Sequence, residues 1–154
     1  FARVQPLFAP LGRNTVHVGA NGAGQVCKSC NQIVVGATIA GVAEAILLAR
    51  AAGVDPARVR EALLGGFAAS RILEVHGQRM IDGQFNPGFK ASLHQKDMRI
   101  VGEAAYELGL ALPSAATIAQ YLNALVGQGL GDADSAAIYK VLEAMNRRPA
   151  VGDP

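Results

Sequence analysis

Hydrophobic positions recur at helical spacing along most of this 154-residue chain. The longest such stretch, residues 24–52, holds no proline, and its apolar side chains fall on every side of the predicted helix. A helix that is apolar all round has neighbours on several sides, so we expect it to be central. Its length would be roughly 40 Å at 1.5 Å per residue. Gly53 follows it and predicts its end.

Shorter helical patterns follow the central one and are separated by turn residues. Asp55 is the expected N-cap of the next helix, with Pro56 at its first position. A loop is predicted at 83–89, where Asn-Pro-Gly interrupts the pattern. The predicted helices after the central one cover residues 55–64, 67–82, 92–108, 113–125 and 135–145.

The first twenty residues differ from the rest. Residues 1–12 hold two prolines and predict an irregular or short helical entry. Residues 14–19 alternate apolar and polar positions, with Val16 and Val18 on one face, which predicts a short strand at the edge of a sheet. We therefore expect an all-α fold, a helical bundle around one long central helix, with a short N-terminal strand.

Composition narrows the class of protein. Hydrophobic residues make up 51% of the chain and aromatic residues only 5%, which is typical of closely packed helices. The net charge of +2 and the lack of a basic cluster argue against a nucleic-acid partner. The apolar run 33–49 is shorter than the ~20 residues of a membrane span and carries Glu44, so we expect no membrane partner.

The N-terminal residues bear on where the protein is located in the cell and on whether the chain is part of a longer protein. Residues 1–9 do not resemble a signal peptide, since Arg3 and Gln5 interrupt the apolar run, and we expect a cytoplasmic protein. The chain begins at Phe1 without an initiator methionine. We expect it to be one domain of a longer protein.

Cys27 and Cys30 form a single Cys-x-x-Cys pair. A structural zinc site needs four ligands, and the histidines, at positions 17, 76 and 94, are scattered. A thioredoxin-type redox site needs a βαβ setting, which the pattern does not predict. We expect the two cysteines to be small residues packed between helices, with no metal site; a redox or zinc protein is the third interpretation.

Lys28, Asn31 and Gln32 lie at spacing i, i+3 and i+4, hence on one face of the predicted central helix. A lysine on such an apolar helix is costly to bury unless it is paired or functional. It could donate or accept a proton in a reaction, or simply reach solvent at the start of the helix. Spacing alone does not decide between these two hypotheses.

Lys96 and Asp97 form the second candidate cluster. They interrupt an otherwise apolar helix face and follow a loop that carries Phe85 and Phe89. Taken alone, this pattern favours a surface ion pair beside two core aromatic residues.

Three stretches, "VHVGANGAGQVCKSCNQ", "NPGFKASLHQKD" and "GLGDADSAAIYKVLE", closely resemble the C-terminal helical domain of the β-hydroxyacid dehydrogenases. This family includes 3-hydroxyisobutyrate dehydrogenase and 2-hydroxy-3-oxopropionate (tartronate semialdehyde) reductase and is related to 6-phosphogluconate dehydrogenase. The resemblance covers about residues 3–145 and keeps the order of the motifs. It changes the interpretation of both clusters from structural to functional.

The resemblance implies roles for residues of the active site. Lys28 matches the family's catalytic lysine, the general acid in carbonyl reduction and the base in the reverse reaction. Asn31 and Gln32 match the amide pair that binds substrate, although many members have Asn-Asn here. Phe89 matches an aromatic residue that lines the substrate pocket.

The cofactor contacts are implied in the same way. Lys96 matches a lysine that reaches the nicotinamide end of NAD or NADP, and Asp97 accompanies it. Gly22 and Gly24 match the glycine turn that leads into the catalytic helix. The glycine-rich cofactor fingerprint itself does not occur here, because "GANGAG" is not followed by a βαβ unit or an acidic ribose ligand.

The resemblance also implies a division of the chain. Residues 1–20 would be the remnant of a cofactor-binding domain, 21–146 the helical substrate and dimerisation domain, and 147–154 a flexible tail. The expected partners are a small carboxylate substrate, a β-hydroxyacid or its semialdehyde, and a second copy of the chain in a homodimer or higher oligomer. We expect the chain alone to be inactive; the alternative is a stand-alone helical dimerisation module.

Overall fold

The computed structural model describes residues 1–8, 10–12 and 14–146. The tail predicted at 147–154 lies outside the described residues. All regular elements within the described ranges are helical, and the central 29-residue helix is where the sequence predicts it. The elements are α1 (Gln5–Phe8), α2 (Ala23–Ala51), α3 (Pro56–Leu64), α4 (Arg71–Asp82), α5 (Ala91–Glu107), α6 (Pro113–Gly127), the 3₁₀ helix η1 (Ser135–Ala137) and α7 (Ile138–Met145).

The strand predicted at 14–19 is wrong. This segment has no regular structure, and its valines are exposed. A strand requires a neighbouring strand to pair with its backbone, and the described part of the chain offers none. The only β-type pairing in the described ranges is one isolated bridge between Lys90 and Asp134.

Capping residues decide where the shorter helices begin and end. The Asp55 carboxylate accepts a hydrogen bond from the Ala57 amide at 2.9 Å, as an N-cap does. The predicted helix 67–82 instead starts at Arg71, because the Ser70 hydroxyl caps it by accepting from the Leu73 amide at 3.0 Å. Gly83 ends this helix with a φ of 66°, a left-handed conformation that glycine adopts without strain.

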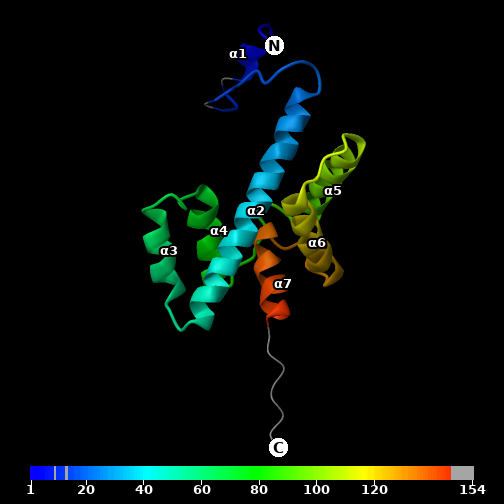
Figure 1. Ribbon diagram of the computed structural model, residues 1–154. Coiled ribbons are helices and arrows are strands. Elements are labelled where there is room, and N and C mark those ends of the chain that lie inside the picture. Colours follow the sequence, from blue (N-terminus) through cyan, green and yellow to red (C-terminus); the bar gives the residue numbers. More distant parts are fainter. Residues whose placement is uncertain (9, 13, 147–154) are drawn as a thin grey trace, which may run out of the picture.

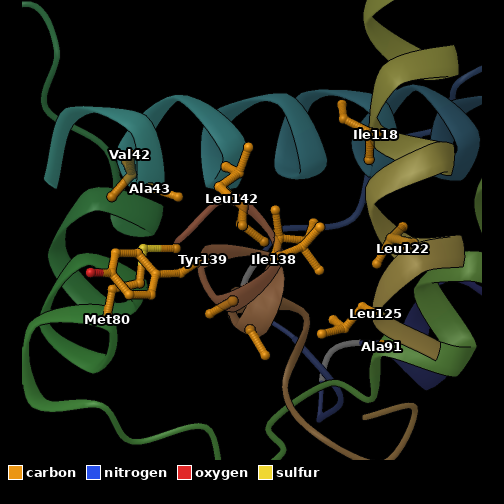
Figure 2. Packing of buried hydrophobic residues seen from close by; sticks show 14 of the residues in the cluster. Val42, Ala43, Met80, Ala91, Ile118, Leu122, Leu125, Ile138, Tyr139 and Leu142 are labelled. Atoms are coloured by element: carbon orange, nitrogen blue, oxygen red, sulfur yellow. The ribbon is translucent and has the colours of Figure 1, made fainter. Parts of the chain in front are cut away.

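Helix α2 is the axis of the bundle (Figure 1). It contacts α3, α4, α5, α6 and α7, with α3 and α4 on one side and α5 and α6 on the other. Figure 2 shows α7 between α4 and α6, with its Ile138 and Leu142 side chains pointing towards the centre of the core. Met80 of α4 lies on one side of this centre, and Leu122 of α6 lies on the other. The apolar core therefore encloses only part of α2.

The two halves of α2 have different surroundings. All eight of its buried residues lie between Gln32 and Ala49. The first turns project past the core, and α5 is the helix that accompanies them (Figure 1). By length and composition α2 also qualifies as a membrane span, with a mean hydropathy of 1.9, but 44% of that window is buried inside the fold. The core helix of a folded domain meets the same criteria.

Candidate active site

Two charged side chains from different helices meet where α2 projects from the core. The Lys28 Nζ atom lies 3.2 Å from both oxygens of Asp97 on α5. The Gln32 amide, one turn after Lys28, donates to Asp97 Oδ2 at 2.8 Å. Asp97 is 5% exposed, whereas Lys28 is 52% exposed. The buried carboxylate therefore anchors a lysine whose ammonium group remains accessible from outside.

A second lysine, Lys96, completes this group of Lys28, Gln32, Lys96 and Asp97, which we call the Lys28 cluster. Lys96 Nζ lies 2.7 Å from Asp97 Oδ1 and is half-exposed. Burial alone would raise the pKa of Asp97, but hydrogen bonds from Lys96, Lys28 and Gln32 outweigh it, so that the pKa is lowered from its usual value. Two cations and one ionised carboxylate leave the cluster with a net positive charge, which suits an anionic ligand.

A pocket of about 260 Å³ opens beside the cluster, between the first turns of α2 and the middle of α5. Its polar wall is formed by the Lys28 cluster. Apolar side chains from both helices make up most of the remaining lining. The lining residues are Gln25, Val26, Lys28, Ser29, Gln32, Lys96, Asp97, Ile100, Ala104 and Leu108.

The structure brings four of the predicted site residues together, namely Lys28, Gln32, Lys96 and Asp97. Asn31 is exposed next to them, and its amide donates to Gln32 Oε1 at 3.0 Å. The remaining three, Phe89, Gly22 and Gly24, do not line this pocket. The roles predicted for all eight residues stay predictions.

The three outlying residues have their own settings. Gly22 caps the N-terminus of α2 with a φ of 91°, and Gly24 is exposed in its first turn. Phe89 lies just before α5, and its ring packs on His94 at a centroid distance of 5.8 Å. Phe89 thus contacts a histidine of the same helix that carries Asp97.

His94 lies directly beneath the cluster and is fully buried. Its Nε2 atom is 3.2 Å from the backbone carbonyl oxygen of Gln32. Burial lowers the pKa of His94; the hydrogen bond to Gln32 and the charge of Asp97 oppose this, but the pKa remains below its usual value. The sequence pattern offers His94 only as one of three scattered candidate metal ligands and does not predict this contact.

Asp134, immediately before η1, ties the loop that precedes α5 to the rest of the fold. It is fully buried, and its Oδ2 atom accepts from the amides of Gly88 at 2.8 Å and Phe89 at 3.2 Å. Arg79 of α4 donates to the same oxygen at 2.6 Å. Oδ1 accepts from the Ala136 amide at 2.9 Å. One carboxylate therefore joins α4, the loop 83–89 and η1.

The residues on either side of Asp134 bind the backbone around the start of α5. The backbone amide of Ala91 donates to the carbonyl oxygen of Ala133 at 2.8 Å, and the Ser135 amide donates to the Phe89 oxygen at 3.0 Å. Burial alone would raise the pKa of Asp134, but neighbouring His76 and three backbone amides lower it far below its usual value. The stretch "GQGLGDADS" predicts a turn and a helix cap, but nothing local marks Asp134 as its buried member.

A polar stripe is the signal that could have located the pocket. Gln25, Lys28 and Gln32 are spaced i, i+3 and i+7, and therefore share one face of α2 with Ser29 beside them. Such a stripe on an otherwise apolar helix predicts a polar site. The apolar wall on α5 could not be found in this way, since Ile100 and Leu108 resemble ordinary core residues.

The prediction that the two cysteines pack between helices is wrong. Cys27 and Cys30 are both exposed and both free. They lie in the part of α2 that projects beyond the core, so neighbouring helices do not cover them. Among the described residues no group of three or more histidine, cysteine or acidic side chains is placed to hold a metal ion.

The fold is a helical domain with a lysine–carboxylate cluster at the exposed end of its central helix, and comparison with known proteins shows its family. Residues 22–142 match the family model described as the NAD-binding domain of NADP-dependent 3-hydroxyisobutyrate dehydrogenase. The chain therefore belongs to the NAD-binding C-terminal domain of the 3-hydroxyisobutyrate dehydrogenase family.

Individual relatives agree with this assignment. The 2-hydroxy-3-oxopropionate reductase of Escherichia coli is 52% identical over 94% of this chain and 50% of its own length. The crystal structure of a 3-hydroxyisobutyrate dehydrogenase from Salmonella typhimurium superimposes with a TM-score of 0.85 at 27% identity, covering 92% of this chain and 50% of that one. The Mycobacterium tuberculosis 3-hydroxyisobutyrate dehydrogenase with L-serine gives 0.80 at 26% identity, with the same coverage. The chain thus spans about half the length of these relatives.

Proposed function

We propose that this chain is the proton-transferring half of an NAD(P)-dependent β-hydroxyacid dehydrogenase, with Lys28 as the general acid. The observation that carries the proposal is the geometry of Lys28. Its ammonium group stands at the wall of a pocket, held from behind by a buried carboxylate and flanked by a second cation. A fixed, accessible ammonium group is what protonation of a carbonyl oxygen requires.

In reduction, the substrate carbonyl would lie with its oxygen at the Lys28 ammonium group. As hydride arrives at the carbonyl carbon, Lys28 gives one proton to the oxygen, and an aldehyde becomes a primary alcohol. In the reverse direction Lys28, having lost its proton, accepts the hydroxyl proton. Asp97 keeps the amine in place throughout through its contact with Nζ. The net positive charge of the cluster favours binding of a substrate carboxylate.

The described residues fit one end of a nicotinamide cofactor. Val26, Ile100 and Leu108 offer an apolar wall for a flat ring, and Lys96 stands at its edge. The pocket is too small for a whole dinucleotide, so the rest would be bound by a separate cofactor domain. A reduced nicotinamide supplies the hydride when bound. Cofactor contacts by Lys96, Asp97, Gly22 and Gly24, and the choice between NAD and NADP, belong to this proposal.

For the substrate we propose a small carboxylated semialdehyde of the 2-hydroxy-3-oxopropionate type, with 3-hydroxyisobutyrate-type hydroxyacids as the alternative. The 52% identity to the reductase from Escherichia coli supports the first. Asn31 remains free to bind substrate with its carbonyl oxygen. In this structure the Gln32 amide nitrogen is engaged by Asp97. Gln32 therefore supports the cluster and would have to exchange this bond to bind substrate directly.

The test is Lys28→Ala in a two-domain enzyme in which a cofactor-binding domain precedes this chain. Turnover should fall by about 10²–10⁴, which is typical for the loss of a positioned proton donor. Lys90→Ala is the matched control, because Lys90 is 50% exposed and also pairs with an aspartate, Asp132, but lies outside the pocket. A loss of less than threefold in Lys28→Ala, or an equal loss in both variants, would contradict the proposal.

The chain by itself should not turn over substrate, because its pocket holds only one end of the cofactor. An assay of NADH and NADPH oxidation with residues 1–154 checks this expectation. Robust turnover would show that the cofactor site is complete without another domain.

A second candidate function is self-association in the cytoplasm, with or without catalysis. Large apolar side chains lie exposed along α2, including Val34 at 65% and Leu48 at 71%. Burial against a second copy would remove this surface from water. Light scattering should then report a homodimer or larger oligomer, whereas a monomer at high concentration would exclude this function.

A further inference from the structure

The contact between His94 and the backbone of α2 has no part in the chemistry described above, yet it lies between two parts of the site. His94 precedes Asp97 by three residues on α5, so both face α2. Asp97 binds the side chain of Gln32, while His94 binds its backbone carbonyl oxygen. Both ends of the Gln32 residue are thus held by consecutive turns of α5.

The fold makes room for this imidazole at one glycine. A Cβ atom on Gly36 of α2 would lie 3.4 Å from His94 Cε1 and 2.7 Å from Ile118 Cγ2. Because glycine carries no side chain, α5 and α6 approach α2 closely here. The ring therefore sits against the backbone of α2, one turn beyond Gln32.

Hydrogen bonding fixes the form of the ring. A carbonyl oxygen can only accept, so Nε2 carries the proton towards Gln32. Nδ1 is fully buried and has no hydrogen-bond partner among the described residues. A second proton on Nδ1 would therefore place an unpaired charge in the interior, which is costly. His94 is held as one neutral tautomer.

The ionisable groups around the ring come from three elements. Asp97 lies on α5 itself, Asp134 lies before η1, and His76 lies on α4. The two carboxylates favour a charged imidazole, whereas burial and His76 oppose it, and burial has the largest effect. The ring also packs on Phe89, the last residue of the loop held by Asp134. His94 thus contacts both Phe89 of this loop and Gln32 of the Lys28 cluster.

We propose that His94 is a positioning residue of the active site, which holds Gln32 and Asp97 in register so that the Asp97 carboxylate meets Lys28. This inference rests on the proposed role of Lys28 for its functional meaning, but the geometry that it predicts can be tested without activity. Loss of the Nε2–H donor would let α5 shift against α2 and weaken the hydrogen bonds that Asp97 receives.

The experiment uses the chain 1–154 and two variants of similar volume. His94→Gln keeps an amide N–H near the position of Nε2, whereas His94→Leu keeps the packing and removes the donor. The carboxyl pKa of Asp97 is followed by ¹³C NMR. It should lie below its usual value in the parent chain and in His94→Gln, and should rise in His94→Leu. An unchanged Asp97 titration in a folded His94→Leu variant would overturn the proposal.

A second measurement needs no variant. Long-range ¹H–¹⁵N correlations of the His94 ring should show protonated Nε2 and unprotonated Nδ1 at neutral pH. A charged ring or the opposite tautomer at neutral pH would also overturn the proposal, even if His94→Leu does not fold. If these results hold while Lys28→Ala retains full turnover, the proposed function fails and the positioning geometry stands.

Discussion

Replacing Asp134 by alanine removes the carboxylate that joins α4, the loop 83–89 and η1. The change leaves the amides of Gly88, Phe89 and Ala136 without their acceptor. It also leaves Arg79 without its carboxylate partner at 2.6 Å. Since Asp134 is fully buried, water at its position can replace these contacts only in part.

The size of the effect follows from this geometry. Breaking a buried ion pair by removing one partner costs about 3–5 kcal/mol. Each buried donor left unsatisfied costs about 1–3 kcal/mol. Gly88 is exposed and Arg79 is 31% exposed, so water can reach part of the gap. We therefore expect a loss near the lower end, about 3 kcal/mol, and a fall in Tm of roughly 6–12 °C for a chain of this size.

The assay is urea unfolding of residues 1–154, followed by far-ultraviolet circular dichroism. Asp132→Ala is the matched control two residues away, since Asp132 is 87% exposed and forms an ion pair with half-exposed Lys90. Its loss of stability should be much smaller, because an exposed surface ion pair contributes little. A loss below 1 kcal/mol in Asp134→Ala, or equal losses in the two variants, would refute the reasoning.

The pH dependence gives an independent check of the same carboxylate. The pKa of Asp134 is lowered in the fold from its usual value of 3.8. Its contribution to the free energy of unfolding is therefore fully present above the unfolded value and is lost as the pH falls below it. Asp134→Asn should show a shallower fall in stability below pH 4 than the parent chain.

Two further predictions follow from the packing of α2. Gly36→Ala should destabilise the fold by about 1–3 kcal/mol, because its methyl group would collide with Ile118. Gly41→Ala in the same helix should stabilise the fold by up to about 1 kcal/mol, because that position is open. Urea unfolding of both variants checks this, and equal effects would contradict the close approach at Gly36. Cys27 and Cys30 should both react with a thiol reagent in the native chain, because both are exposed; a thiol count below two without denaturant would contradict that exposure.

The predicted helix boundaries that agree with the structure are those with a local cause. Asp55 with Pro56 starts a helix, and Gly53 and Gly83 follow helix ends, because capping depends on a few consecutive residues. The helix predicted to start at 67 starts later, at Arg71, because the Ser70 hydroxyl caps α4 by accepting from the Leu73 amide. The strand at 14–19 was wrong for a different reason: alternation predicts a pleated face but supplies no partner for the backbone.

The sequence alone determined the helical class, the long central helix and the polar stripe that includes Lys28, because these depend on composition and on spacing within one helix. Only the tertiary structure decided what that stripe meets. Lys28 and Asp97 are 69 residues apart in the chain and 3.2 Å apart in the fold. No local pattern encodes that separation, nor the burial of Asp97 and His94 beneath the exposed lysine. These features arise where α5 crosses α2, and the missing side chain of Gly36 lets them approach closely enough.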